Sequence, residues 1–221
     1  FASVSMWLPL LLALPARALY PTSAPLRTGT LGVSPLHTLY FEEHGRADGA
    51  PALFLHGGPG SGSFARHAGF FDPQHYRVVL YDQRGCGLST PTGCLDENDT
   101  ASLVADIERL RLHLQVVRWE VVVGGSWGVT LALAYAVAHP RSVGALVLRA
   151  VCLMRSHETR WLFGEEGGAA RLQPDGWEAF ARHAEESGAS GGGGERALRQ
   201  YVRLLAAADG STRAAVARAW T

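Results

Sequence analysis

The stretch that decides the fold runs from Val121 to Gly128 and reads VVVGGSWG. The three valines are typical of a buried strand, and the small-residue run VTLALAYA at 129–136 is typical of a helix. Between them lies a Gly-x-Ser-x-Gly turn, in which only small neighbours let a strand and a helix approach closely around a strained serine. The pattern predicts that the Ser126 hydroxyl group stands above the edge of a sheet, at the positive end of a helix.

A chance origin is the alternative for this pentapeptide, because the chain contains 26 glycines. The strand before it and the helix after it supply the structural context that the motif requires. We therefore interpret Ser126 as a candidate nucleophile for acyl transfer.

The composition is that of an ordinary globular protein. The chain has 221 residues, 47% of them hydrophobic, with 20 basic and 20 acidic side chains. This length suits one α/β domain with a second small unit. The basic residues are all arginines and are spread along the chain, so we expect neither nucleic acid nor a membrane surface as a partner. Three cysteines without metal-ligand spacing indicate thiols in a reducing compartment, hence a cytoplasmic location, and no metal site.

The first 30 residues are interpreted as a leader or targeting-like segment followed by a linker. The apolar run at 6–18 ends in Ala-Arg-Ala and imitates a signal peptide, although no positive charge precedes it and it is too short to span a bilayer. A targeting peptide and a non-native leader both remain open. Because the chain begins at Phe1 and not at Met, we expect it to be a fragment.

Strand-like segments alternate with helical ones over residues 31–150, which we expect to form the N-terminal part of an α/β core. The expected strands are Leu36–His44 as an edge strand, Ala52–Leu55, Tyr76–Tyr81 and Gly144–Arg149. A helix capped by Asp99 or Thr100 has one apolar face, made by Leu103, Ile107, Leu110 and Leu114. This alternation predicts a mostly parallel sheet with helices on both faces.

Two of these strands end in loops of chemical interest. HGGPG at 56–60 follows one strand, and glycines there let backbone N–H groups turn inward as in an oxyanion hole; a plain turn is the alternative. After the next strand, Asp82 and Arg84 are expected to pair and fix the loop, with a solvated turn as the alternative. Cys86 has no nearby histidine to activate it and is interpreted as a loop thiol.

Residues 151–221 change in character and are expected to form the start of a helical cap. Helical pieces are expected around Trp161 and Trp177, over Ala197–Ala208 and over Thr212–Trp220, with a flexible loop at Ser187–Gly194.

With these motifs in place, the chain resembles the prolyl aminopeptidases (proline iminopeptidases), serine peptidases of the α/β-hydrolase fold. The resemblance covers residues 31–221. It rests on HGGPG at 56–60, FDPQHYRVVLYDQRGCGLSTP at 71–91, LVADIERLR at 103–111, GGSWG at 124–128 and LVLR at 146–149.

The resemblance implies a site and a reaction. Ser126 would be the nucleophile, and the backbone N–H groups of Gly58 and Trp127 would form the oxyanion hole. Arg149 and Cys152 would belong to the substrate pocket; many family members have an aromatic residue where Cys152 stands. The implied reaction releases an N-terminal proline from a peptide through an acyl-enzyme, without metal or cofactor.

The acid and the base of the expected triad have no clear candidates. In α/β-hydrolases they follow the serine, in the order Ser, acid, His, after later strands. The candidates after Ser126 lie at helix ends or in the expected cap: His139, His157, His183, Asp175 and Asp209. We therefore expect the triad Asp and His to lie beyond Thr221. Two rival functions remain open: another hydrolase of this fold, such as an esterase or amidase, and a non-catalytic, truncated hydrolase-like chain.

Overall fold

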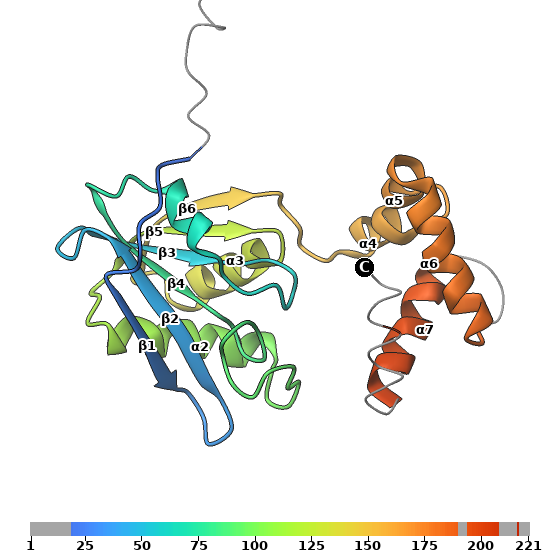
Figure 1. Ribbon diagram of the computed structural model, residues 1–221, viewed down its shortest axis with the longest axis horizontal. Helices are drawn as coiled ribbons and strands as arrows, with labels where there is room; N and C mark the ends of the chain where they lie inside the picture. The colour runs from blue at the N-terminus through green and yellow to red at the C-terminus, as the bar shows by residue number, and fades with distance from the viewer. Residues whose placement is uncertain (1–18, 190–193, 208–215, 217–221) are drawn as a thin grey trace, which may run out of the picture. The chain divides into compact units, whose positions relative to one another are not determined.

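The computed structural model describes residues 19–189, 194–207 and 216. The chain divides between Val151 and Cys152 into two compact units. The first contains a six-stranded sheet and the second a group of helices (Figure 1). The leader-like run at 6–18 and all but residue 216 of the helix expected at 212–220 lie outside the described residues.

The sheet of the first unit is mostly parallel, as predicted. Its strands are β1 (Arg27–Gly32), β2 (Thr38–Gly45), β3 (Ala50–Leu55), β4 (Tyr76–Tyr81), β5 (Trp119–Gly125) and β6 (Val143–Arg149). They lie in the order β1-β2-β4-β3-β5-β6. The pairs β4–β3, β3–β5 and β5–β6 are parallel, whereas β1 and β2 join by antiparallel pairs. The carboxyl ends of β3, β4 and β5 therefore meet at one edge.

One prediction about the edge of the sheet is wrong. The segment predicted as the edge strand forms β2, which lies inside the sheet because β1 pairs with its outer side. β1 occupies a stretch for which the sequence largely predicts a linker. Its sequence, RTGTLG, has no buried residue, so it gives no hydrophobic signal. The ring of Phe41 instead covers Gly29, where a side chain would collide with it.

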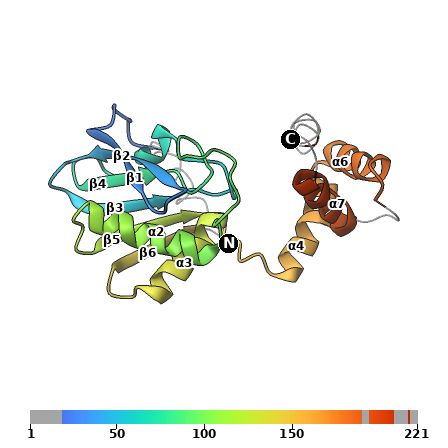
Figure 2. The ribbon, with the colours of Figure 1, turned by 90° about the horizontal axis from the view of Figure 1, so that it is seen from below.

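Neighbouring residues of the strands alternate between two hydrophobic cores. Leu53 and Leu55 of β3 face one core, which α2 (Thr100–His113) and α3 (Trp127–Ala138) cover. Ala52 and Phe54 face the other core, against the 3₁₀ helix η1 (Ala65–Phe70). Figures 1 and 2 show α2 and α3 side by side, and the two helices are in contact.

The predicted apolar face of α2 is confirmed. Its four members are all buried: Leu103, Ile107, Leu110 and Leu114. The helix begins after Asp99, whose side chain accepts a 2.7 Å hydrogen bond from the N–H group of Ser102. Such a cap satisfies one of the free N–H groups at the start of the helix.

The second unit is helical. It contains α4 (Ser156–Phe163), α5 (Gly168–Leu172), α6 (Pro174–Glu186) and α7 (Gly194–Ala207). Its small core includes Ala184, Ala197, Tyr201 and Val216, and the rings of Phe180 and Tyr201 stack with centroids 4.6 Å apart. Among the helices of the described residues, none combines the length and apolar character that a membrane crossing requires.

Candidate active site

Ser126 lies at the turn between β5 and α3, as the sequence predicts. Its φ of 54° and ψ of −118° are unusual for a residue with a side chain. Backbone of this kind costs about 1–3 kcal/mol and persists only where surrounding contacts hold it. Two hydrogen bonds do so here: the Ser126 N–H group donates to the carbonyl oxygen of Arg149 at 3.0 Å, and the Ser126 carbonyl oxygen accepts from Val129 at 2.9 Å.

The glycines around Ser126 permit close packing of three backbone segments. A Cβ atom on Gly124 would collide with the carbonyl oxygen of Gly128, so the strand and the helix touch at this point. A Cβ atom on Gly128 would collide with the carbonyl oxygen of Leu55, at the end of β3. The Gly-x-Ser-x-Gly pattern therefore has a packing reason in this chain.

The HGGPG loop after β3 lies against the same turn. A Cβ atom on Gly57 would stand 2.9 Å from the carbonyl oxygen of Gly125 and 3.2 Å from the Cβ atom of Ser126. Gly58 has a φ of 116°, a conformation that glycine adopts readily. The hydroxyl group of Ser61 donates to the carbonyl oxygen of Gly57 at 2.9 Å and closes the loop.

The amino end of α3 faces this region too. Trp127 is the first residue of α3, and the first N–H groups of a helix have no partner within the helix. The dipole of the helix places partial positive charge there. The structure therefore brings three of the predicted site residues, Ser126, Gly58 and Trp127, into adjoining segments of backbone.

Gln83, which sequence reasoning missed, connects these segments. It follows β4 by two residues and is buried. Its side-chain N–H group donates to the carbonyl oxygen of His56 at 2.9 Å, and its side-chain oxygen accepts from the indole N–H group of Trp127 at 3.1 Å. The only signal in the sequence was its place just beyond a strand whose carboxyl end lies beside that of β3.

His56 is a buried structural residue of this loop. Its Nε2 atom accepts a hydrogen bond from the backbone N–H group of Gln83 at 3.1 Å, so the ring proton is on Nδ1, which donates to the carbonyl oxygen of Gly57 at 2.9 Å. Burial lowers the pKa of His56, which keeps the ring neutral.

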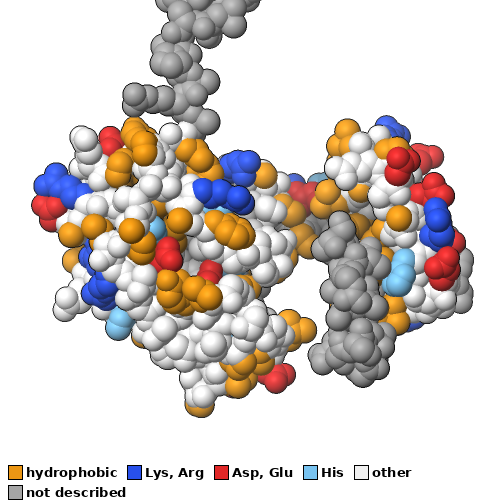
Figure 3. Space-filling view, viewed as in Figure 1, with side chains coloured by type: hydrophobic (Ala, Val, Ile, Leu, Met, Phe, Trp, Pro, Cys, Tyr) orange, Lys and Arg blue, Asp and Glu red, His pale blue; other side chains and the backbone are white. Residues whose placement is uncertain are grey.

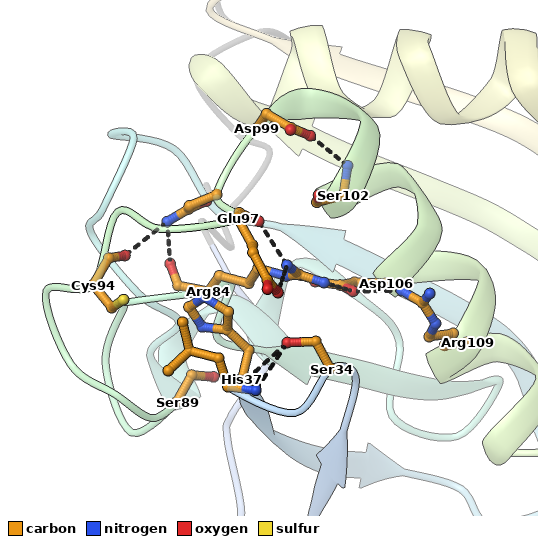
Figure 4. A network of polar contacts seen from close by, with 12 residues as sticks. Ser34, His37, Arg84, Ser89, Cys94, Glu97, Asp99, Ser102, Asp106 and Arg109 are labelled. Carbon is orange, nitrogen blue, oxygen red and sulfur yellow. Dashed lines mark hydrogen bonds and ion pairs between the residues drawn. The ribbon is translucent and has the colours of Figure 1, made fainter.

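The expected pair of Asp82 and Arg84 does not form, and neither residue is in a solvated turn. Both are buried, and each has other partners. The Asp82 carboxylate accepts from the N–H groups of Ser63 at 2.6 Å and Leu88 at 2.8 Å. Arg84 forms a two-pronged pair with Asp106 of α2, at 2.6 and 2.8 Å, seen in Figure 4. The loop is fixed, but by backbone groups and a helix carboxylate.

Cys86 agrees with its interpretation as a loop thiol. The side chain is buried and donates to the carbonyl oxygen of Arg84 at 3.2 Å. Burial raises its pKa to about 11, so the reactive thiolate form is disfavoured.

Among the described residues of the first unit, 19–151, no histidine or carboxylate hydrogen-bonds the Ser126 hydroxyl group. His139 caps the opposite end of α3, and a rise of about 1.5 Å per residue places it roughly 20 Å from Ser126. It lies 4.0 Å from Glu108. Burial lowers the pKa of His67, which stacks on Phe54, to about 4. His157, His183 and Asp175 belong to the second unit, and Asp209 lies outside the described residues.

An apolar cavity of about 310 Å³ adjoins the turn on the face of the sheet that carries η1. Phe54, Phe70 and Val147 contribute to its walls, as do Gly125 and Arg149. The participation of Arg149 in a substrate pocket remains a prediction. The same holds for Cys152, whose thiol contacts the sulfur of Met154 at 3.5 Å.

Several charged side chains of the first unit form ion pairs with neighbours of opposite charge. Arginine side chains lie at several separate places on the face drawn in Figure 3. Arg27 and Arg77 both contact Glu43, at 3.2 and 2.5 Å, and Arg46 pairs with Asp48 at 2.6 Å. Within the described part of the chain, no group of three or more His, Cys, Asp or Glu side chains is placed to hold a metal ion.

Comparison with known proteins places this fold and turn in a family. The model of the alpha/beta hydrolase fold family matches residues 51–187, and the chain belongs to that family. Within it, the chain is similar to proline iminopeptidases, as its motifs indicated. The chain is 49% identical to the proline iminopeptidase of Arabidopsis thaliana over 205 residues. This match covers 93% of this chain and 52% of the relative. It is also 49% identical to the proline iminopeptidase of Xanthomonas citri, and this match covers 93% of this chain and 63% of the relative.

The crystal structure of the proline iminopeptidase of Mycobacterium smegmatis has the same fold. It matches with a TM-score of 0.55 at 22% identity, over 87% of this chain and 66% of that one. The chain thus spans about half to two thirds of the length of these relatives.

Proposed function

We propose that the protein is a serine aminopeptidase that releases an N-terminal proline from peptides through an acyl-enzyme. One observation carries the proposal: Ser126, at a strained strand-to-helix turn, lies against the glycine loop at Gly57 and Gly58. Acyl transfer requires a nucleophile beside the carbonyl carbon of the substrate and backbone N–H groups beside its carbonyl oxygen. The substrate class comes from the similarity to proline iminopeptidases.

In the proposed reaction, the Ser126 oxygen attacks the carbonyl carbon of the N-terminal proline residue. The carbonyl oxygen becomes an oxyanion, which accepts hydrogen bonds from the backbone N–H groups of Gly58 and Trp127. Each such donor is worth about 3–4 kcal/mol in the transition state. The serine proton passes to a histidine base and then to the departing amine, after which water releases proline from the ester.

The triad Asp and His, in this proposal, lie outside the described residues. The second unit would act as the cap that selects the substrate, with Cys152 beside the proline ring. We further propose a reducing, cytoplasmic location, supported by the three cysteines, all described and none in a disulfide.

An esterase or amidase of the same fold is the rival, because the same turn serves both reactions. The test compares three substrates of the full-length protein: proline arylamide, alanine arylamide and a simple aryl ester. We expect kcat/KM to be highest for proline arylamide, about 10-fold or more above that for alanine arylamide. An apolar pocket that fits the proline ring distinguishes it from a smaller apolar side chain at about that level. Hydrolysis of the ester with no measurable release of proline would support the rival.

A further inference from the structure

The two candidate oxyanion donors, the N–H groups of Gly58 and Trp127, lie past the last paired residues of β3 and β5. The β3–β5 ladder ends at the pair Leu55 and Gly124. Gly58 and Trp127 each lie three residues past that pair, Gly58 in the loop after β3 and Trp127 at the first position of α3. Something other than strand pairing must therefore set the separation of their N–H groups, on which stabilisation of an oxyanion depends.

The side chain of Gln83 links the loop after β3 to the start of α3. Its amide bridges the carbonyl oxygen of His56 and the indole of Trp127. A carbonyl oxygen can only accept and an indole N–H can only donate, so the orientation of the amide is determined. The backbone N–H group of Gln83 also holds His56 by its ring, and that ring holds the carbonyl of Gly57.

Burial makes this link stiff. Gln83 is 2% exposed and His56 is 1% exposed, so water does not compete for the two hydrogen bonds between them, whereas the bond to the Trp127 indole is partly buried. The chain of contacts runs from Trp127 through the Gln83 amide to His56. All of it lies within the first unit.

We propose that Gln83 is a positioning residue of the oxyanion hole, which sets the separation between the backbone N–H groups of Gly58 and Trp127. The inference rests on the proposed function in assigning the oxyanion to these two groups. In this proposal Gln83 touches neither the substrate nor Ser126, and it affects the rate of the chemical step through the two N–H groups.

The test is Gln83→Met in the full-length protein, because methionine keeps the length of the side chain and removes both hydrogen bonds. The matched control is Asn98→Leu. The Asn98 amide also links two backbone carbonyls in the loop after β4, those of Arg84 and Cys94, but away from the two donors. For each variant, kcat and KM are measured with proline arylamide and with an aryl ester, together with Tm.

We expect Gln83→Met to lower kcat by about 10- to 100-fold with both substrates, and KM to stay within about 3-fold. Complete loss of one oxyanion donor costs about 10²–10³ in kcat, and displacement of a donor costs less. Asn98→Leu should lower Tm while keeping kcat within about 2-fold. If Gln83→Met behaves like Asn98→Leu, its role is structural only and the inference is wrong.

A second variant covers the case in which Gln83→Met does not fold. Trp127→Phe removes only the indole end of the link, and we expect a smaller fall in kcat, about 3- to 10-fold, again with KM almost unchanged. An unchanged kcat in this variant contradicts the inference. The ester separates the two proposals: its hydrolysis without release of proline overturns the proposed specificity, yet it still reports the effect of Gln83.

Discussion

The turn at Ser126 depends at the residue scale on the absence of side chains around it. Ser126 itself keeps a positive φ, and Gly128 brings α3 against the end of β3. Two of the glycines around the serine, Gly125 and Gly128, are not equivalent. A Cβ atom on Gly128 would collide with backbone, whereas one on Gly125 would have no atom within 4 Å.

Gly128→Ala should therefore destabilise the protein, and Gly125→Ala should not. We expect a loss of about 1–3 kcal/mol for Gly128→Ala, as for other overpacked sites, because the obstructing atom belongs to backbone. Gly125→Ala should stay within about 0.5 kcal/mol. Urea unfolding of both variants measures the difference. Equal stability of the two would mean that the close approach of α3 to β3 is wrong.

The residues that carry the site differ in how far the sequence revealed them. Ser126 stands in a local motif that strand and turn patterns select, whereas the choice of Gly58 and Trp127 as oxyanion donors came from the family resemblance. Gln83 could not be found in this way, because its partners His56 and Trp127 are 27 and 44 residues distant in the chain. For Arg84, the nearest carboxylate in the sequence was the wrong partner, because backbone N–H groups already occupy Asp82.

At the scale of elements, α2 is fastened to the loop after β4 by the buried pair of Arg84 and Asp106. The two side chains are 3% and 0% exposed. Arg109 contacts the same carboxylate from the surface, with half of its side chain exposed. Without Asp106, the buried Arg84 guanidinium would stay charged and keep only the half-exposed Glu97 carboxylate, 3.7 Å away, as an ionic partner, which is costly.

Asp106→Asn should destabilise the protein by about 3–5 kcal/mol, the range for breaking a buried pair from one side. Arg109→Ala is the matched control, for which we expect less than about 1 kcal/mol, since its contact is exposed. Both values come from denaturant unfolding near neutral pH. A cost for Asp106→Asn as small as that of Arg109→Ala would show that the pair does not hold the loop.

The contact of α2 with α3 includes a carboxylate with a displaced pKa. Glu108 accepts hydrogen bonds from Arg111 at 2.6 Å and from the hydroxyl group of Tyr135 at 2.8 Å. The hydrogen bond from Arg111 lowers the pKa of Glu108 from 4.5 to about 2. Because the folded pKa lies below the unfolded value, this contribution to stability is complete above pH 4.5 and is lost as the pH falls toward 2.

Glu108→Gln should accordingly lower stability near pH 7, by about 1–3 kcal/mol, the usual worth of hydrogen bonds to a charged group. It should also reduce the loss of stability between pH 4.5 and pH 2. Thermal unfolding of wild type and variant across this range provides the measurement. Parallel curves would contradict the assignment of this carboxylate.

The fold as a whole was more predictable than its edge. Alternation of apolar strands and helices indicated the parallel sheet, because buried strands and amphipathic helices have clear periodicity. β1 gave no such signal, since its place depends on pairing with β2 and not on burial. The helical character of the second unit was also predicted, although most of the last helix expected from the sequence falls outside the described residues.

The central claim for the whole molecule is that Ser126 is the nucleophile of a proline-releasing hydrolase. The most direct test measures kcat/KM of the full-length protein with proline arylamide, for wild type and for Ser126→Ala, with unfolding curves as the control for folding. We predict a fall of about 10⁴-fold or more with an unchanged fold, because only the attacking oxygen is removed. Retention of more than about 5% of the activity by Ser126→Ala would contradict the claim.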